Sequence, residues 1–201
     1  MRRGLLLKIC AAAVVLYLAL SVVRGAEYLL LTACAVLIHE AGHVAAAKAL
    51  RVPFVRVRGS LVGFSLKFDF SAVSYFKEFS VCAAGAAANV AACAVSFLLA
   101  DGRGAHFVFF IFSNLSLAVF NLLPISPLDG AGMLSSLLSL IVSARSAERI
   151  SSFVSAAFSL AFFIFCTYVQ MKIGVNFSLL FISVYLIYNT AKNAGIIQKA
   201  P

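Results

Sequence analysis

Two histidines and a glutamate lie close together in an otherwise apolar segment of this chain. They are His39, Glu40 and His43, in the run VLIHEAGHVAAA at residues 36–47. If the segment is helical, the spacing of four places both imidazoles on one face, one turn apart. Two such nitrogens can fill two corners of a tetrahedral zinc site. Glu40 lies about 100° round the helix from His39, where its carboxylate can act as a base toward a water on the metal without being a ligand. The pattern therefore predicts metal-dependent hydrolysis, with a peptide bond as a suitable target.

The apolar surroundings strengthen this interpretation. Inside a membrane span each ionisable side chain costs several kcal/mol unless it is satisfied, which removes most chance matches to the spacing. Two alternative roles stay open for these side chains. The three residues could form a buried polar group that hydrogen-bonds neighbouring helices, or they could relay protons in a transporter. No inverted repeat or pair of broken helices supports the transporter.

A second stretch, NLLPISPLDG at residues 121–130, offers a third ligand. Asp129 is the one acid of this region, and Pro124 and Pro127 prevent a regular helix. A broken helix at membrane depth is tolerated only where it faces protein or a water-filled cavity. We expect a helical run to resume over Gly132–Val142. Asp129 is a candidate metal ligand, and its alternative role is to cap that helix, which one carboxylate can do while also binding a metal.

These groups belong to a chain suited to the membrane. It has 201 residues, of which 63% are hydrophobic and 11% charged, whereas soluble domains are about 50% apolar and about 25% charged. Its apolar residues fall in blocks near the ~20 residues that cross a hydrocarbon core. We expect an α-helical membrane protein with about six transmembrane helices in a single domain, residues 1–201. The candidate spans are residues 5–23, 28–50, 75–100, 105–123, 150–171 and 175–191.

The first candidate span could instead be a signal peptide, because basic residues precede its apolar run. Arg24 stands where a cleavage site would be expected, which favours a retained helix.

The chain has sixteen Lys and Arg residues, and they divide unevenly between the two sides of the membrane if there are six spans. Three of them, Arg24, Arg103 and Lys172, would lie on one side, and all others on the opposite side. By the positive-inside rule both termini are then cytoplasmic. The net charge of +9 reflects this topology and attraction to anionic lipid. We expect no nucleic-acid partner, because no basic helix with interleaved aromatic residues is present.

The stretch VPFVRVRGSLVGFSLKFDF, at about residues 52–70, has a different period. Phe64, Leu66 and Phe68 alternate with polar residues, as in a strand with one apolar side. Glycines between the two halves can supply a turn, so we expect a β-hairpin. The plain alternative is a connector between two spans. A strand edge near the active site would hold a substrate extended by pairing with it, and the three apolar residues are candidate substrate contacts.

Asn89, Asn114 and Asn121 lie in apolar spans. For Asn114 we favour an interhelical hydrogen bond, which is the usual role of such amides in membranes. For Asn121, beside the broken helix, we favour contact with the substrate or with an oxyanion. Asn89 is a further candidate for substrate binding.

HEAGH in an early transmembrane helix, followed about ninety residues later by NLLPISPLDG, closely resembles the motif pair of the site-2 protease family of intramembrane zinc metalloproteases. The resemblance implies that His39, His43 and Asp129 bind one zinc ion (Zn2+) and that Glu40 is the catalytic base. It also implies that Asn121 helps to hold the substrate backbone, and that the hairpin lies at the cytoplasmic mouth of the site.

Size and layout resemble the compact bacterial sporulation members that process a sigma-factor precursor. The run Gly85-Ala86-Ala87-Ala88-Asn89 keeps the glycine and asparagine of the family's Gly-Pro-x-x-Asn motif and lacks its proline. We expect neither a PDZ nor a CBS domain. The implied partners are the lipid bilayer, a membrane-tethered protein substrate and membrane-bound regulators, in a bacterial inner or mother-cell membrane. The alternative is a catalytically silent relative that binds membrane segments, which the intact His39, Glu40, His43 and Asp129 disfavour.

Overall fold

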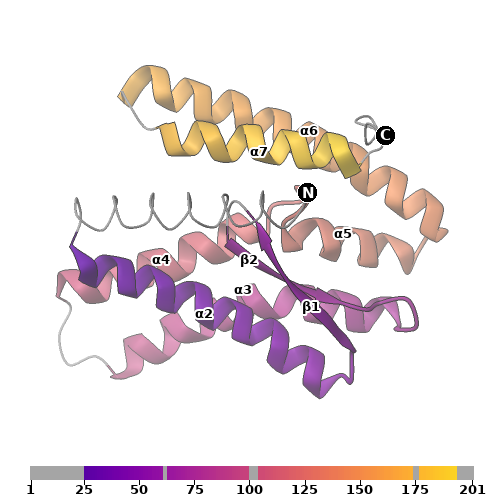
Figure 1. Cartoon of the computed structure of the whole chain (residues 1–201), viewed down its shortest axis with the longest axis horizontal. Coiled ribbons are helices and arrows are strands. Elements are labelled where there is room, and N and C mark those ends of the chain that lie inside the picture. Colours follow the sequence, from indigo (N-terminus) through magenta and orange to yellow (C-terminus); the bar gives the residue numbers. More distant parts are fainter. Residues whose placement is uncertain (1–24, 61–62, 100–103, 174–176, 194–201) are drawn as a thin grey trace, which may run out of the picture. The chain divides into compact units, whose positions relative to one another are not determined.

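The computed structural model describes residues 25–60, 63–99, 104–173 and 177–193 (Figure 1). The expected first span, residues 5–23, lies outside the described residues. The helices are α2 (Ala26–Ala49), α3 (Tyr75–Leu99), α4 (Ala105–Asn121), α5 (Asp129–Ser139), α6 (Ala144–Ile173) and α7 (Phe177–Asn193). The strands are β1 (Phe54–Ser60) and β2 (Gly63–Phe68). The chain divides into two compact units, one of Met1–Ala72 with Ala84–Val119, the other of Val73–Ala83 with Phe120–Pro201.

Three of the described helices are long and apolar enough to cross a membrane: α2, α3 and residues 144–172 of α6. The shorter helix α4 is also strongly apolar. Large apolar side chains on these helices are exposed, for example Leu37, Leu98 and Met171. Such surfaces are typical of helices that face lipid. The protein is therefore an integral membrane protein, while the number of six crossing helices stays a prediction.

The largest difference from the expected helix boundaries is at α6, which begins at Ala144 and not near residue 150. Its first two turns carry charged residues, so an apolar block could not reveal them. A local cap explains the early start. The Ser146 amide donates to Ser143 Oγ at 3.3 Å, and the two hydroxyls lie 2.9 Å apart. A serine in this position satisfies an otherwise unpaired amide of the first turn.

In the first unit, β1 and β2 form an antiparallel pair, in register from Phe54 opposite Phe68 to Ser60 opposite Gly63, with an irregularity after Phe54. The rings of Phe54 and Phe68 meet edge to face, with centroids 5.9 Å apart. Strand β2 contacts α2. Just after β2, Ser71 donates its hydroxyl to Asp69 Oδ1 at 2.6 Å and its amide at 3.0 Å. These bonds lower the pKa of the Asp69 carboxyl, the hydroxyl contributing most.

Helices α2 and α3 approach so closely that their backbones touch. A Cβ added to Gly42 would lie 2.5 Å from the carbonyl oxygen of Ala84 and 2.7 Å from Ala88 Cβ. Small residues at helix contacts are the usual way in which membrane helices come this near. The close contact fixes the distance between the α2 face that carries the histidines and the α3 face opposite.

The second unit is built on α6 and α7, which run side by side, with α5 packed against α6 (Figure 1). Cys166 of α6 and Leu186 of α7 are among its buried residues. Between α4 and α5 the chain passes through a non-helical segment, residues 122–128. Ile125 of this segment is fully buried. The segment leads directly into Asp129, the first residue of α5.

Candidate metal centre

The first unit brings His39 and His43 together on one face of α2. Both side chains are buried, with 4% and 6% of their surface exposed. Their Nε2 atoms lie 3.2 Å apart. Two nitrogens bound to one tetrahedral zinc at about 2.0–2.1 Å would lie about 3.3 Å apart. The pair therefore has the spacing of two ligands of a single metal ion.

Asn89 of α3 fixes the ring of His39. Its Oδ1 lies 2.7 Å from His39 Nδ1. Its Nδ2 donates to the carbonyl of Ala35 at 3.0 Å and to Asn114 Oδ1 at 2.8 Å. Both amide hydrogens are then used, so Oδ1 must accept from His39. We therefore assign the hydrogen of the imidazole to Nδ1, which leaves the lone pair of Nε2 for a metal.

Gly85 of α3 leaves space directly beside the two histidine nitrogens. A Cβ at this position would lie 2.7 Å from His39 Nε2, and closer still to His43 Nε2. Real Cβ atoms essentially never approach another atom so closely. The room next to both nitrogens exists because residue 85 is a glycine. Convergent nitrogens, a hydrogen-bonded outer partner and open space beside them fit a bound metal ion.

In the second unit, Asp129 occupies the first turn of α5 and is partly buried. The cap position belongs to Leu128, whose backbone is extended and which makes no side-chain cap hydrogen bond. Asp129 is therefore not at the cap position itself, and α5 begins earlier than the expected Gly132. A carboxylate in the first turn is stabilised by the helix dipole. A Cβ on Gly130 would clash with the carbonyl groups of Leu122 and Leu123, so the first turn of α5 packs directly against the backbone of these two residues.

Two comparisons with known proteins bear on this arrangement. Residues 99–165, which include the whole NLLPISPLDG stretch, match the model of Peptidase family M50. The matched residues are one third of the chain and include the candidate ligand Asp129. No curated protein matches its sequence. The fold is similar to that of the site-2 protease from Methanocaldococcus jannaschii, with a TM-score of 0.65 and 20% identity over 96% of this chain and 91% of that chain.

The family match and the fold similarity together support an intramembrane metalloprotease, and the resemblance drawn from HEAGH and NLLPISPLDG is confirmed. The sporulation type within the family remains a prediction. The fold similarity, at 20% identity, shows the architecture alone.

The other predicted site residues have different surroundings. Glu40 is half-buried on α2, beside His39, and Asn121 is half-buried at the end of α4. Asn89, a candidate substrate contact, is fully buried, and protein groups engage both ends of its amide. Asn114 forms the interhelical hydrogen bond expected of it.

Two features of the centre were not recognised from the sequence as supports for the histidines. Gly85 and Asn89 are four residues apart on α3, so they share the face that meets the histidines. The same spacing was visible in the sequence as a partial motif. Of the three apolar candidates in the hairpin, Phe68 packs on Phe54, while the side chains of Phe64 and Leu66 lie outside the described part.

Proposed function

We propose that this protein uses one zinc ion, held by His39, His43 and Asp129, to hydrolyse a peptide bond of a membrane-tethered protein. These residues offer two imidazole nitrogens and a carboxylate oxygen, a donor set that could hold a metal ion. Three protein ligands with a fourth position open are typical of catalytic zinc. The observation that carries the proposal is the convergence of the two Nε2 atoms, 3.2 Å apart, beside Gly85. When bound, zinc supplies Lewis-acid chemistry that activates water and polarises a carbonyl.

We assign Glu40 the role of catalytic base. Its carboxylate comes from the same turn of α2 as His39 but points to a different side of the helix. In the reaction it takes a proton from the attacking water and delivers it to the leaving nitrogen. The C–N bond then breaks to give a carboxylic acid and an amine. Asn89 acts through His39 as a positioning residue, and Asn121 holds the substrate backbone.

The hairpin is proposed to hold the substrate. A transmembrane helix must unwind before a protease can cut it, and an extended segment gains hydrogen bonds by adding to a strand edge. The two strands pair only with each other within the described residues, so each has one edge without a strand partner there. We assign Phe64, Leu66 and Phe68 of β2 to contacts with substrate side chains. A regulatory protein anchored by one span is the proposed substrate class, with a sigma-factor precursor as one member.

The proposed setting is a bacterial inner or mother-cell membrane crossed six times, with both termini in the cytoplasm. The basis is the uneven distribution of Lys and Arg among the loops. Membrane-bound regulators are further proposed partners, since the substrate must reach the site through the bilayer.

The test separates metal binding from catalysis. The wild-type protein in detergent is expected to hold about one zinc per chain and to cleave a co-expressed single-span substrate. Glu40→Gln should keep the zinc and lose cleavage, because the amide cannot take the proton. His43→Ala should lose both. A Glu40→Gln enzyme that cleaves at the wild-type rate would refute the mechanism. Zinc binding without cleavage of any single-span candidate by the wild type would favour the silent regulator.

A further inference from the structure

The segment before Asp129 contains two prolines and no helical turn, so its backbone groups need partners from elsewhere. In an apolar setting each unpaired carbonyl costs several kcal/mol. Two carbonyls are satisfied locally: Leu123 accepts from the Ile125 amide at 2.7 Å, and Ile125 accepts from the Leu128 amide at 2.7 Å. The carbonyls of Pro124 and Ser126 are satisfied by side chains of α6 and α7.

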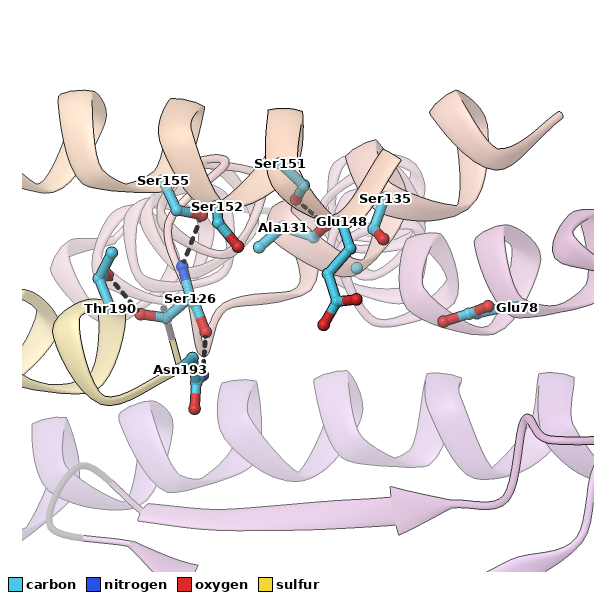
Figure 2. Close-up of a pocket in the computed structure, with 11 residues that line it drawn as sticks. Glu78, Ser126, Ala131, Ser135, Glu148, Ser151, Ser152, Ser155, Thr190 and Asn193 are labelled. Carbon is cyan, nitrogen blue, oxygen red and sulfur yellow. Dashed lines mark hydrogen bonds between the residues drawn. The ribbon is translucent and has the colours of Figure 1, made fainter. Parts of the chain in front are cut away.

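Ser126 is held at each of its polar groups by a different side chain (Figure 2). Its amide donates to Ser155 Oγ at 3.2 Å, and its carbonyl accepts from Thr190 Oγ1 at 3.2 Å. Its hydroxyl accepts from Asn193 Nδ2 at 2.5 Å. We call Ser155, Thr190 and Asn193 the Ser126 clamp. Ser155 also donates to the Pro124 carbonyl at 2.9 Å, so one hydroxyl of α6 bonds two points of the segment.

The two hydroxyl members of the clamp are oriented by their own surroundings. Ser155 and Thr190 are 2% and 4% exposed. Ser159, one turn after Ser155, donates to the Ser155 carbonyl at 2.6 Å and lies 3.5 Å from Thr190 Oγ1. Buried polar groups with every partner in place resist displacement, because moving one leaves others unpaired. The clamp is therefore a stiff part of the second unit.

The clamp acts on a short piece of chain. Only Pro127 and Leu128 separate Ser126 from Asp129. On the far side of Asp129, a Cβ on Gly130 would lie 2.5 Å from the carbonyl carbon of Leu122, and Ala131 accepts from Ser151 Oγ at 3.4 Å. Asp129 is thus fixed from both directions. Ser126 and the three clamp residues line a cavity of about 250 Å³, and Glu78 and Glu148 also line it (Figure 2).

We propose that Ser155, Thr190 and Asn193 are positioning residues that set the metal affinity of the enzyme by fixing the Asp129 carboxylate. None of them is a ligand, and the effect passes through the backbone of Ser126. The inference rests on the proposed function, in which Asp129 binds the metal. It adds that α6 and α7, which supply neither histidine, contribute to the metal centre.

The experiment uses the full chain in detergent and zinc alone as the probe, with affinity measured by competition against a chelator. Thr190→Val keeps the shape of the side chain and removes the hydroxyl. We expect about 10-fold weaker zinc binding, the lower end of the effect of lost outer partners. Thr190→Ser should bind as the wild type does. Thr167→Val is the matched control, because within the described residues its hydroxyl bonds only the Phe163 carbonyl of its own helix.

A second variant guards against a folding defect. Asn193 is exposed, so Asn193→Ala leaves the core intact, and we expect about 10-fold weaker zinc binding for it as well. Added zinc should restore cleavage by either weakened variant. Wild-type affinity in both Thr190→Val and Asn193→Ala, alongside a large loss in Asp129→Ala, would overturn the positioning role alone. Unchanged affinity in Asp129→Ala would overturn Asp129 as a ligand, and with it the proposed metal site.

Discussion

Replacing Gly85 with alanine should remove metal binding while leaving the fold in place. The new Cβ would lie 2.7 Å from His39 Nε2, whereas ordinary contacts begin at 3.4 Å, so that ring alone must shift by about 0.7 Å. Ligand distances in working metal sites vary by only about 0.2 Å. Separation of the helices would relieve the clash only by stretching the 2.7 Å hydrogen bond between His39 and Asn89 and by opening the close packing of Gly42 on Ala84.

The measured quantity is bound zinc after desalting, followed by competition with a chelator. We expect the zinc content to fall from about one ion per chain to almost none, with an affinity loss of about 100-fold. Gly104→Ala is the matched control, since a Cβ there has no neighbour within 4 Å and zinc binding should be unchanged. The unfolding midpoints of the metal-free variants should agree within a few degrees. A Gly85→Ala enzyme that folds, holds one zinc at wild-type affinity and cleaves would refute this account of the centre.

Three further predictions concern the support of the site, the hairpin and the topology. Asn89→Leu leaves His39 Nδ1 without this partner, so the free energy of unfolding should fall by about 1–3 kcal/mol and zinc should bind about 10-fold more weakly; equal affinity would contradict the positioning role. Leu66→Pro removes a backbone donor of β2 and should lower cleavage sharply at unchanged zinc content, whereas normal cleavage would make the hairpin a simple connector. Reporter fusions after Ala144 and Lys172 should mark the cytoplasmic and the opposite side respectively, and a reversed pattern would overturn the proposed orientation.

The lengths of the apolar blocks predicted the boundaries of those helices that are apolar from end to end. Helices α2, α3 and α4 lie within two residues of the expected ranges. The prediction failed at the polar start of α6 and at the start of α5, where local backbone contacts and not hydropathy set the boundary. Leu128 holds an extended cap position and Gly130 packs against the Leu122 carbonyl, and neither feature has a period that a sequence can show.

Parts of the candidate site could likewise be predicted from the sequence, and other parts could not. His39 and His43 could be paired from the sequence because both belong to one helix, where spacing determines the face. The bond from Asn89 to His39 joins residues fifty positions apart and depends on how closely α2 and α3 pack. The Ser126 clamp was missed because its residues look like small polar substitutions in apolar runs. Ser151, Ser155 and Ser159, spaced by four, were the available signal of a polar stripe on α6.

The amide chain behind His39 has a consequence for how the enzyme is assembled. Asn114 donates to the Phe110 carbonyl of its own helix at 2.9 Å, which directs its oxygen to Asn89, and Asn89 in turn directs its oxygen to His39. The direction of every bond is set by a backbone carbonyl at the start of the series, not by an ion at its end. The imidazole therefore receives its correct tautomer from folding itself. Folding in the membrane and metal binding are then separate steps. A cell could therefore fold the protease first and activate it later through its supply of zinc.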